Sequence, residues 1–493
     1  MFGKKNQTKA ELQSGENPLQ NSASGSNPQQ SSKIVERRPW RDLWAAALFL
    51  AGLGAFVYAA YLGIPNTIAS LQNPGSPTNT VFTAGVSFWQ VIHPMITMLA
   101  TALGATLLAV GLIQAIPRFM MNLFYGVFCV FIILIGAYVI SYGGVRNIVS
   151  GCVVIILAGL YVWGSLSFYE TSEGVANFYK ASSYITRQFP ATIFASFLGM
   201  IISLFFIVTW LATSYGITNI VLNKYFTVDP SSGQIVQSNN TMLISVLVGL
   251  ALILFWTLQV IQNVVYVTCS GLLALVFYQG TLDASGKIHI PTQLPTLRAA
   301  GRALTSSFGS ICFGSLLISI IQTLRYLANI AQNMGDDNGD NFILALIRCC
   351  LICILVILQD ILYYFNHFAF AHVAVYGDSF CQAAKSTWRL LESEGLGPVI
   401  VDNLVDSVVV LGGVTVGLIT GLAAIASIES DKSIPQTNVH YITYCSIGFA
   451  LGAYCFFSMM TFMLSAVSTT IVCYADSSTA VSRILPRIST SWL

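Results

Sequence analysis

The sequence contains very little charge. Only 9% of its 493 residues are Asp, Glu, Lys or Arg, against roughly 25% in a typical soluble domain. A soluble globule of this length needs far more charge on its surface, whereas a bilayer tolerates a chain that is 55% hydrophobic with a mean hydropathy of +0.72. The net charge of +2 argues against a nucleic-acid partner, which requires a basic surface. The composition therefore predicts an all-α protein that crosses a membrane several times.

Signatures of enzymes and of ATP-driven pumps are also scarce. No Walker A motif is present, because the stretch 280–287 has the wrong spacing and Ile288 stands where Ser or Thr is required. The five histidines include one H-x4-H pair, His367 and His372. They are too few for a membrane di-iron oxidase, so the pair is interpreted as a local polar feature. No nucleophile–base or metal constellation is visible, and we expect neither an enzyme nor a bound metal or cofactor.

The eleven cysteines lie almost entirely in or beside apolar runs. No predicted outer loop carries a clear pair, so the pattern does not indicate a disulfide framework. Cys349, Cys350 and Cys353 share a hydrophobic run without a nearby histidine. We interpret them as small buried hydrophobic residues rather than as metal ligands.

Ten apolar runs are each long enough to cross a ~30 Å hydrocarbon core, which takes about 20 helical residues. They cover roughly residues 43–62, 85–116, 123–142, 148–168, 191–215, 242–277, 308–331, 342–365, 399–425 and 441–467. The second and sixth runs are longer than the others and are expected to be tilted or broken. This transmembrane domain, residues 39–475, follows a polar tail, 1–38, that is predicted to be disordered, and precedes a second tail, 476–493.

The basic residues set the expected orientation. With the N-terminus inside, most of the 22 basic residues fall on the cytoplasmic side, including Arg37, Arg38 and Arg41 just before the first run. The predicted outer loops hold acids instead. We therefore expect an even number of spans and two cytoplasmic termini. The sequon that begins at Asn239 then lies in an outer loop, which makes Asn239 a glycosylation candidate.

Two predicted inner connections, 174–189 and 380–391, have the pattern of helices that lie on a membrane surface. The second places Lys385 and Arg389 beside Trp388, and basic residues are expected on the wet face of such a helix. A solvated loop helix without a lipid role is an equally reasonable interpretation.

Small residues recur four positions apart in two of the predicted spans. One stripe is Ser306, Ser310 and Gly314, and the other is Gly413, Gly417 and Gly421. Such stripes lie on one helix face and let two helix backbones approach closely. We interpret both as helix-packing residues. A sliding contact in a moving transporter is the second interpretation.

Polar side chains at membrane depth are the candidates for a solute path. The sixth run has polar residues three or four positions apart that share one face, namely Trp256, Gln259, Asn263 and Tyr266. Such a face is costly in hydrocarbon unless it meets protein or water. In the eighth run, Asp360 is the only acid well inside a predicted span, and Tyr363 follows it. Aromatic faces suit a quaternary ammonium ion, although packing is the more ordinary role of any single Trp.

Two longer stretches resemble a known family. Residues 255–268, Phe-Trp-Thr-Leu-Gln-Val-Ile-Gln-Asn-Val-Val-Tyr-Val-Thr, resemble the sixth span of the choline transporter-like family. Residues 302–316, Arg-Ala-Leu-Thr-Ser-Ser-Phe-Gly-Ser-Ile-Cys-Phe-Gly-Ser-Leu, are similar to its most distinctive motif. Further matches follow the eighth run at Asn366, Tyr376-Gly377, Ser379-Phe380, Ala384-Lys385 and Trp388. The likeness covers about residues 41–476. The polar tail and short first outer loop look like the fungal pH-nine-sensitive branch.

The resemblance implies ten spans, cytoplasmic termini and a plasma-membrane location. It also implies transport, because some animal members are implicated in choline and ethanolamine uptake. The large cysteine-bearing outer domain of those animal members is missing here. We hypothesise a facilitative or ion-coupled carrier of a small organic cation, such as choline or an ethanolamine-like solute, with spans six to nine lining its path. The alternative is a non-transporting scaffold or lipid-organising protein. Membrane lipids are the other expected partners, and no nucleic acid is expected.

Overall fold

The protein is a bundle of long helices, as the sequence predicts. The computed structural model describes residues 39–72, 88–144, 148–156, 159, 169–228, 235–237, 240–334, 342–394, 397–430 and 437–485. Nine helices among these residues are long and apolar enough to cross a membrane, which confirms the all-α, polytopic membrane class. The predicted tail 1–38, Asn239 and most of the run 148–168 lie outside the described residues, so the tenth span stays a prediction.

The helices follow the apolar runs of the sequence, because a helix satisfies its own backbone hydrogen bonds in hydrocarbon. In chain order the elements are α2 (Leu43–Gln72), α3 (Phe88–Ala115), α4 (Pro117–Ser141), α6 (Tyr169–Gln188), α7 (Ala191–Tyr225), β1 (Phe226–Val228), β2 (Ile235–Gln237), α8 (Asn240–Gln279), β3 (Thr281–Leu282), β4 (Ile288–His289), α9 (Pro295–Leu304), α10 (Phe308–Met334), α11 (Phe342–Tyr376), α12 (Phe380–Glu394), α13 (Gly397–Ser430), α14 (Asn438–Asp476) and α15 (Ser478–Ile484). Residues 148–156 are also helical. α6 and α12 correspond to the two predicted inner connections, whereas α9 was not predicted.

The two longest predicted runs form single helices. α8 is continuous over 40 residues, which is about 60 Å at ~1.5 Å per residue. It therefore extends well beyond a ~30 Å hydrocarbon core instead of being broken within it. α3 spans 28 residues and carries Pro94 inside its first two turns.

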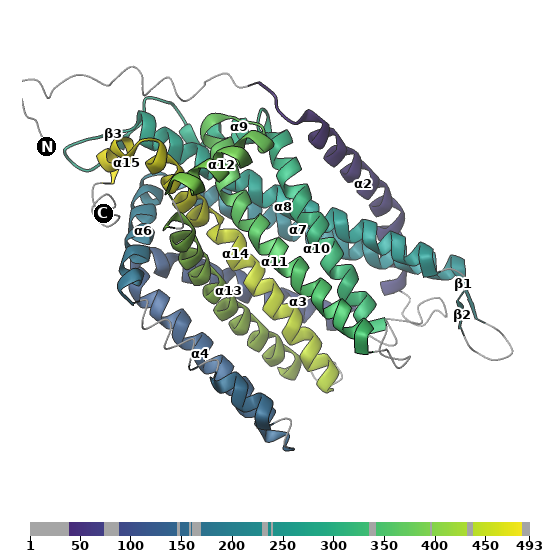
Figure 1. Cartoon of the computed structure of the whole chain (residues 1–493). Coiled ribbons are helices and arrows are strands. Elements are labelled where there is room, and N and C mark those ends of the chain that lie inside the picture. The colour runs from purple at the N-terminus through teal and green to yellow at the C-terminus, as the bar shows by residue number, and fades with distance from the viewer. Residues whose placement is uncertain are drawn as a thin grey trace, which may run out of the picture.

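The short elements gather at the two ends of the bundle (Figure 1). α9, α12, α15 and the β3–β4 hairpin lie at one end, here called the α9–α12 end, and the β1–β2 hairpin lies at the other. Both pairs of strands are antiparallel. Glycine shapes two turns at the α9–α12 end. Gly286 closes the β3–β4 turn at φ +78°, and Gly377 follows α11 at φ +74°, where a left-handed residue commonly ends a helix.

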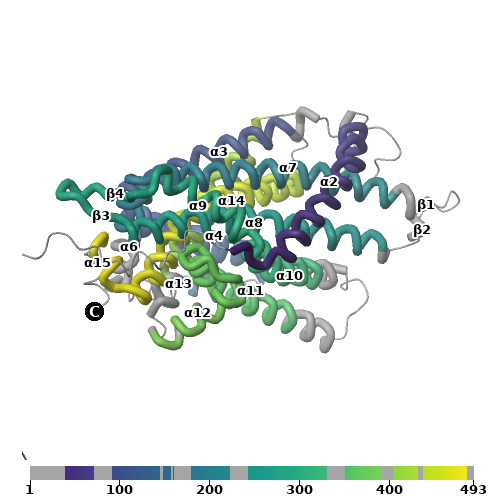
Figure 2. Tube along the Cα trace, turned by 90° about the horizontal axis from the view of Figure 1, so that it is seen from above, coloured from purple at the N-terminus to yellow at the C-terminus, as the bar shows by residue number. Residues whose placement is uncertain are grey.

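The centre of the bundle is formed by α13 and α14, with α8 beside them. In the most apolar stretch of α14, 67% of residues are buried, and the share is 61% in α13, 17% in α2 and 11% in α4. α2 and α4 accordingly lie on opposite flanks in Figure 1. Figure 2 shows α8 between α7 on one side and α10 and α11 on the other, and α8 contacts all three as well as α14.

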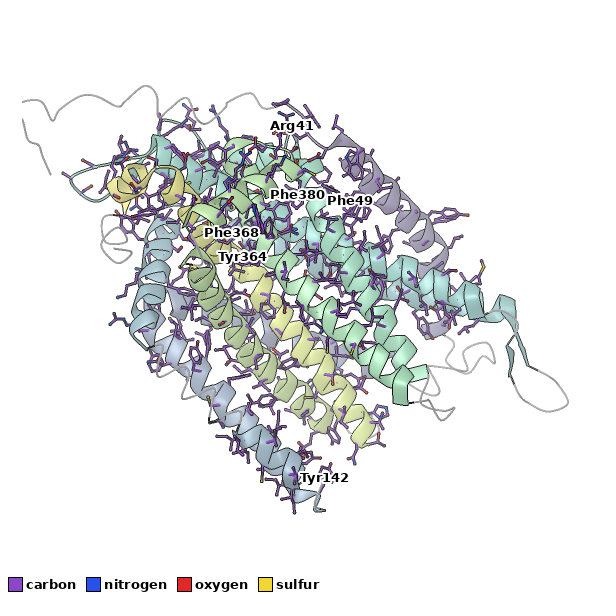
Figure 3. The ribbon with its side chains drawn as sticks, in the orientation of Figure 1. Arg41, Phe49, Tyr142, Tyr364, Phe368 and Phe380 are labelled. Atoms are coloured by element: carbon purple, nitrogen blue, oxygen red, sulfur yellow. The ribbon has the colours of Figure 1, made fainter. Side chains whose placement is uncertain are left out.

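The start of α2 is fixed to α10 and α12 through one carboxylate. Oδ2 of Asp42 accepts hydrogen bonds from Oγ of Ser310 at 2.7 Å and from the backbone N–H of Phe380 at 2.9 Å. The second bond caps the first turn of α12, where a negative charge is favourable. Gly309 lies so close that a Cβ on it would be 2.2 Å from the carbonyl oxygen of Arg41. Arg41 and Phe380 accordingly lie at the same end of the molecule in Figure 3.

The glycine stripe of α13 packs against α14. A Cβ on Gly417 would be 2.8 Å from the carbonyl oxygen of Phe449, and a Cβ on Gly421 would be 3.1 Å from that of Cys445. Gly413 lies equally close to an aromatic ring of α14. The backbones approach closely because these positions have no side chain, which is how small residues act in membrane helices.

We predict that Gly417→Ala destabilises the protein, because the added methyl group meets a backbone carbonyl that cannot turn aside. The expected loss is about 1–3 kcal/mol, measured as a lower melting temperature of the purified protein in detergent. Gly104→Ala is the matched control, since Gly104 is exposed on α3 and a Cβ there meets nothing within 4 Å. Equal melting temperatures for the two variants would contradict the close α13–α14 contact.

Candidate solute path

One face of α8 carries polar side chains that bond to α10. Trp256 is only 4% exposed, and its Nε1–H donates to the carbonyl oxygen of Cys312 at 3.0 Å. Asn263 is 9% exposed, and its Nδ2 donates to Oγ of Ser315 at 2.9 Å. The face that the sequence singles out is therefore turned towards a neighbouring helix, where polar groups find partners within the hydrocarbon.

The same face continues towards α11 through Tyr266. Its hydroxyl donates to the carbonyl oxygen of His367 at 3.0 Å, and the two rings are stacked with centroids 5.3 Å apart. Tyr363 also contacts His367, and the centroids of these two rings are 4.4 Å apart. Trp256, Asn263 and Tyr266, together with the groups they bond on α10 and α11, are called the α8 seam below.

A short segment of α10 receives bonds from two helices. Between the seam partners Cys312 and Ser315, the carbonyl oxygen of Gly314 accepts a hydrogen bond from Nδ2 of the buried Asn366 on α11 at 3.2 Å. A Cβ on Gly314 would lie 2.4 Å from the ring of Phe380. The first predicted stripe of small residues therefore meets α2 through Ser310, and α11 and α12 through Gly314.

The structure does not bring all the predicted path residues together. Gln259 is half-buried, and Tyr363 is 36% exposed while it contacts the seam at His367. Asp360 is exposed, as are Ile357 and Ile361 on either side of it. The reason is the position of α11. Residues 366–375 of α11 are buried in the bundle, whereas residues 350–363 are mostly exposed.

Gln262 is a polar residue at membrane depth that the sequence analysis did not select. Its Nε2 donates to Oγ of Ser458 at 2.5 Å, and its Oε1 accepts from Oγ1 of Thr461 at 2.8 Å. Both partners belong to α14, so Gln262 fixes the other side of α8. An amide within an apolar run was the available signal, but it lies on a different face from Asn263.

Comparison with known proteins identifies the family. A family model described as plasma-membrane choline transporter matches residues 152–478. A CTL-like protein of Dictyostelium discoideum is 30% identical over 404 residues, which cover 80% of this chain and 66% of that relative. Protein PNS1 of Debaryomyces hansenii is 26% identical over 458 residues, covering 90% of this chain and 84% of that relative. Protein PNS1 of Saccharomyces cerevisiae is 25% identical over 382 residues, covering 74% and 67%.

The family model covers more than half of the chain, and it includes both stretches that carry the resemblance in the sequence, residues 255–268 and 302–316. It also includes the α8 seam and its partners on α10 and α11. The predicted resemblance, including its fungal branch, is confirmed by these matches. The helical bundle with its apolar spans is that of a polytopic membrane protein, and the chain belongs to the choline transporter-like family.

Proposed function

We propose that the protein carries a small organic solute across the plasma membrane, with a choline-like cation as the leading substrate. Transport would be facilitative or coupled to an ion, not driven by ATP, and the protein would not act as an enzyme. Both termini would face the cytoplasm. The observation that carries the proposal is the α8 seam, a continuous series of polar groups at membrane depth in a chain of this family. Polar groups inside the bilayer are costly, so their gathering on one face of α8 supports a path for a polar solute.

The seam supports a path that opens between α8 and α10. In this conformation the side-chain N–H groups of Trp256 and Asn263 donate hydrogen bonds to α10 and not to water. A separation of the two helices would release these donors, and a solute or water would then take the place of their partners. The rings of Trp256 and Tyr266 would offer faces to an ammonium ion.

Asp360 would supply negative charge from the exposed stretch of α11 that precedes the seam partner His367. Its neighbours Ile357 and Ile361 are exposed by 58% and 55%, as expected for residues in contact with lipid. A carboxylate among them costs several kcal/mol unless it meets a cation or water. This cost supports a role in attracting a cation, and the proposal keeps Asp360 for that reason.

The decisive experiment is uptake of radiolabelled choline into liposomes that contain the purified full-length protein. We expect saturable uptake above that of empty liposomes, without added ATP and reduced by excess unlabelled choline. Folding is checked in the same preparation by a cooperative melting transition. Well-folded protein that takes up no more choline than empty liposomes would reject the choline substrate.

Asn263→Leu is expected to lower choline uptake by roughly tenfold, the equivalent of about 1.4 kcal/mol. The substitution keeps the size of the side chain but removes the amide that would face the open path. Ser245→Ala is the control, because Ser245 is exposed on the same helix and its variant should transport normally. If Asn263→Leu transports as well as Ser245→Ala, Asn263 does not line the path.

Asp360→Asn is expected to raise the choline concentration needed for half-maximal uptake, because the variant no longer attracts the cation. Its melting temperature should be equal to or above that of the parent protein, since a carboxylate is removed from an apolar surface. Asp283→Asn serves as the control, because Asp283 is exposed in the β3–β4 turn. Identical uptake curves for the two variants would remove Asp360 from the mechanism.

A further inference from the structure

An open cleft lies at the α9–α12 end, between α11, α12 and α14. Its volume is about 510 Å³, within the range of roughly 300–1,000 Å³ that is usual for small-molecule sites. Its polar lining consists chiefly of His372, Tyr376, Asp378, Ser386, Arg389 and Asp476. None of these belongs to the α8 seam, and none was predicted as a path residue.

His372 is the unusual member of this lining. The residue is only 6% exposed, yet neither Nδ1 nor Nε2 has a hydrogen-bond partner among the described residues. Its ring is stacked on Tyr376 with centroids 5.6 Å apart, which fixes its orientation. A buried polar group without a partner destabilises the folded protein. The imidazole therefore favours a bound molecule that offers it a hydrogen bond.

The charges around His372 favour a cation. Asp378 and Asp476 contribute two carboxylates and Arg389 one guanidinium, so the lining is negative overall with a neutral imidazole. Oδ2 of Asp476 is held in place by the hydroxyl of Tyr278, which donates to it at 2.6 Å. The ring of Tyr376 adds an aromatic face, which a quaternary ammonium can contact.

We propose that this cleft binds a small organic cation that carries a hydroxyl group, with the hydroxyl on His372 and the ammonium drawn to Asp378 and Asp476. A neutral imidazole has one donor and one acceptor nitrogen, and a hydroxyl can bond to either. The proposal rests on the proposed function in one respect, namely that the cation is the transported solute. The cleft is then the binding station at one mouth of the path, and His372 selects for the hydroxyl.

The test compares the binding of choline and tetramethylammonium, which lacks the hydroxyl, to the full-length protein in lipid nanodiscs. We expect calorimetry to show choline binding roughly fivefold more tightly, the equivalent of one neutral hydrogen bond. His372→Phe keeps a ring over Tyr376 and should abolish this preference while leaving tetramethylammonium affinity unchanged. Asp476→Asn should weaken both ligands to a similar extent.

Two further variants guard against misfolding and against effects outside the cleft. His372→Gln retains a donor and an acceptor, and it should keep part of the preference for choline even if His372→Phe melts at a lower temperature. Asp283→Asn, at the same end but outside the lining, should bind both cations normally. A choline preference that survives in His372→Phe, or binding of inorganic phosphate in place of both cations, would overturn the proposal.

The binding and uptake experiments test the cleft assignment and the transport proposal independently. If choline is transported but its preference over tetramethylammonium does not depend on His372, the assignment of the cleft is wrong and the proposed function stands. If choline binds with a His372-dependent preference but is not taken up by liposomes, the cleft is correctly assigned and the transport proposal falls.

Discussion

The hydrogen bonds that α8 makes to its neighbours stabilise the bundle in a region where polar groups have no water to bond to. Trp256 and Asn263 bond to α10, Tyr266 bonds to α11, and Gln262 bonds to α14. Apolar contacts between these helices add little directional preference, because lipid tails are as apolar as the side chains they would replace. The polar bonds therefore determine which face of α8 meets which neighbour. Each contributes on the order of 0.6–2 kcal/mol, and α8 is the one described helix that joins all three partners in this way.

The contact between α13 and α14 is of a different kind. It is built on glycines that bring two backbones together, as at Gly417 and Gly421, and its strength comes from close packing. Packing of this type fixes the distance between two helices. It restricts their sliding along each other's axis less than directional side-chain hydrogen bonds do. The bundle thus combines hydrogen-bonded contacts around α8 with a glycine-lined packing contact between α13 and α14. These two kinds of contact both involve α14, because Gln262 of α8 forms hydrogen bonds to it.

The sequence was sufficient for the helical membrane class, for nine apolar helices among the described residues and for the buried face of α8 at Trp256 and Asn263, because these depend on local patterns of period and hydropathy. It could not place Asp360, since an apolar run looks the same whether it lies at the centre or at the edge of a bundle. It could not reveal the bonds of Asp42 either, because its partners Ser310 and Phe380 lie hundreds of positions away. His372 was interpreted as a local polar feature, and only the packing of α12 and α14 around it shows that its nitrogens are buried without a hydrogen-bond partner in the described part of the chain.

The α8 seam and the cleft are linked by α8 itself. From Trp256 to Tyr278 the helix rises about 33 Å at ~1.5 Å per residue, close to the ~30 Å thickness of the hydrocarbon core. Polar side chains mark this stretch at Trp256, Asn263 and Tyr266, and it ends where Tyr278 donates to Asp476 in the lining of the cleft. One helix thus joins the α8 seam to a cleft whose lining carries two carboxylates and one guanidinium. In the proposed path, a cation that leaves the carboxylates of the cleft would pass the ring of Tyr376 and then the rings of the seam, so that aromatic faces replace the lost charge.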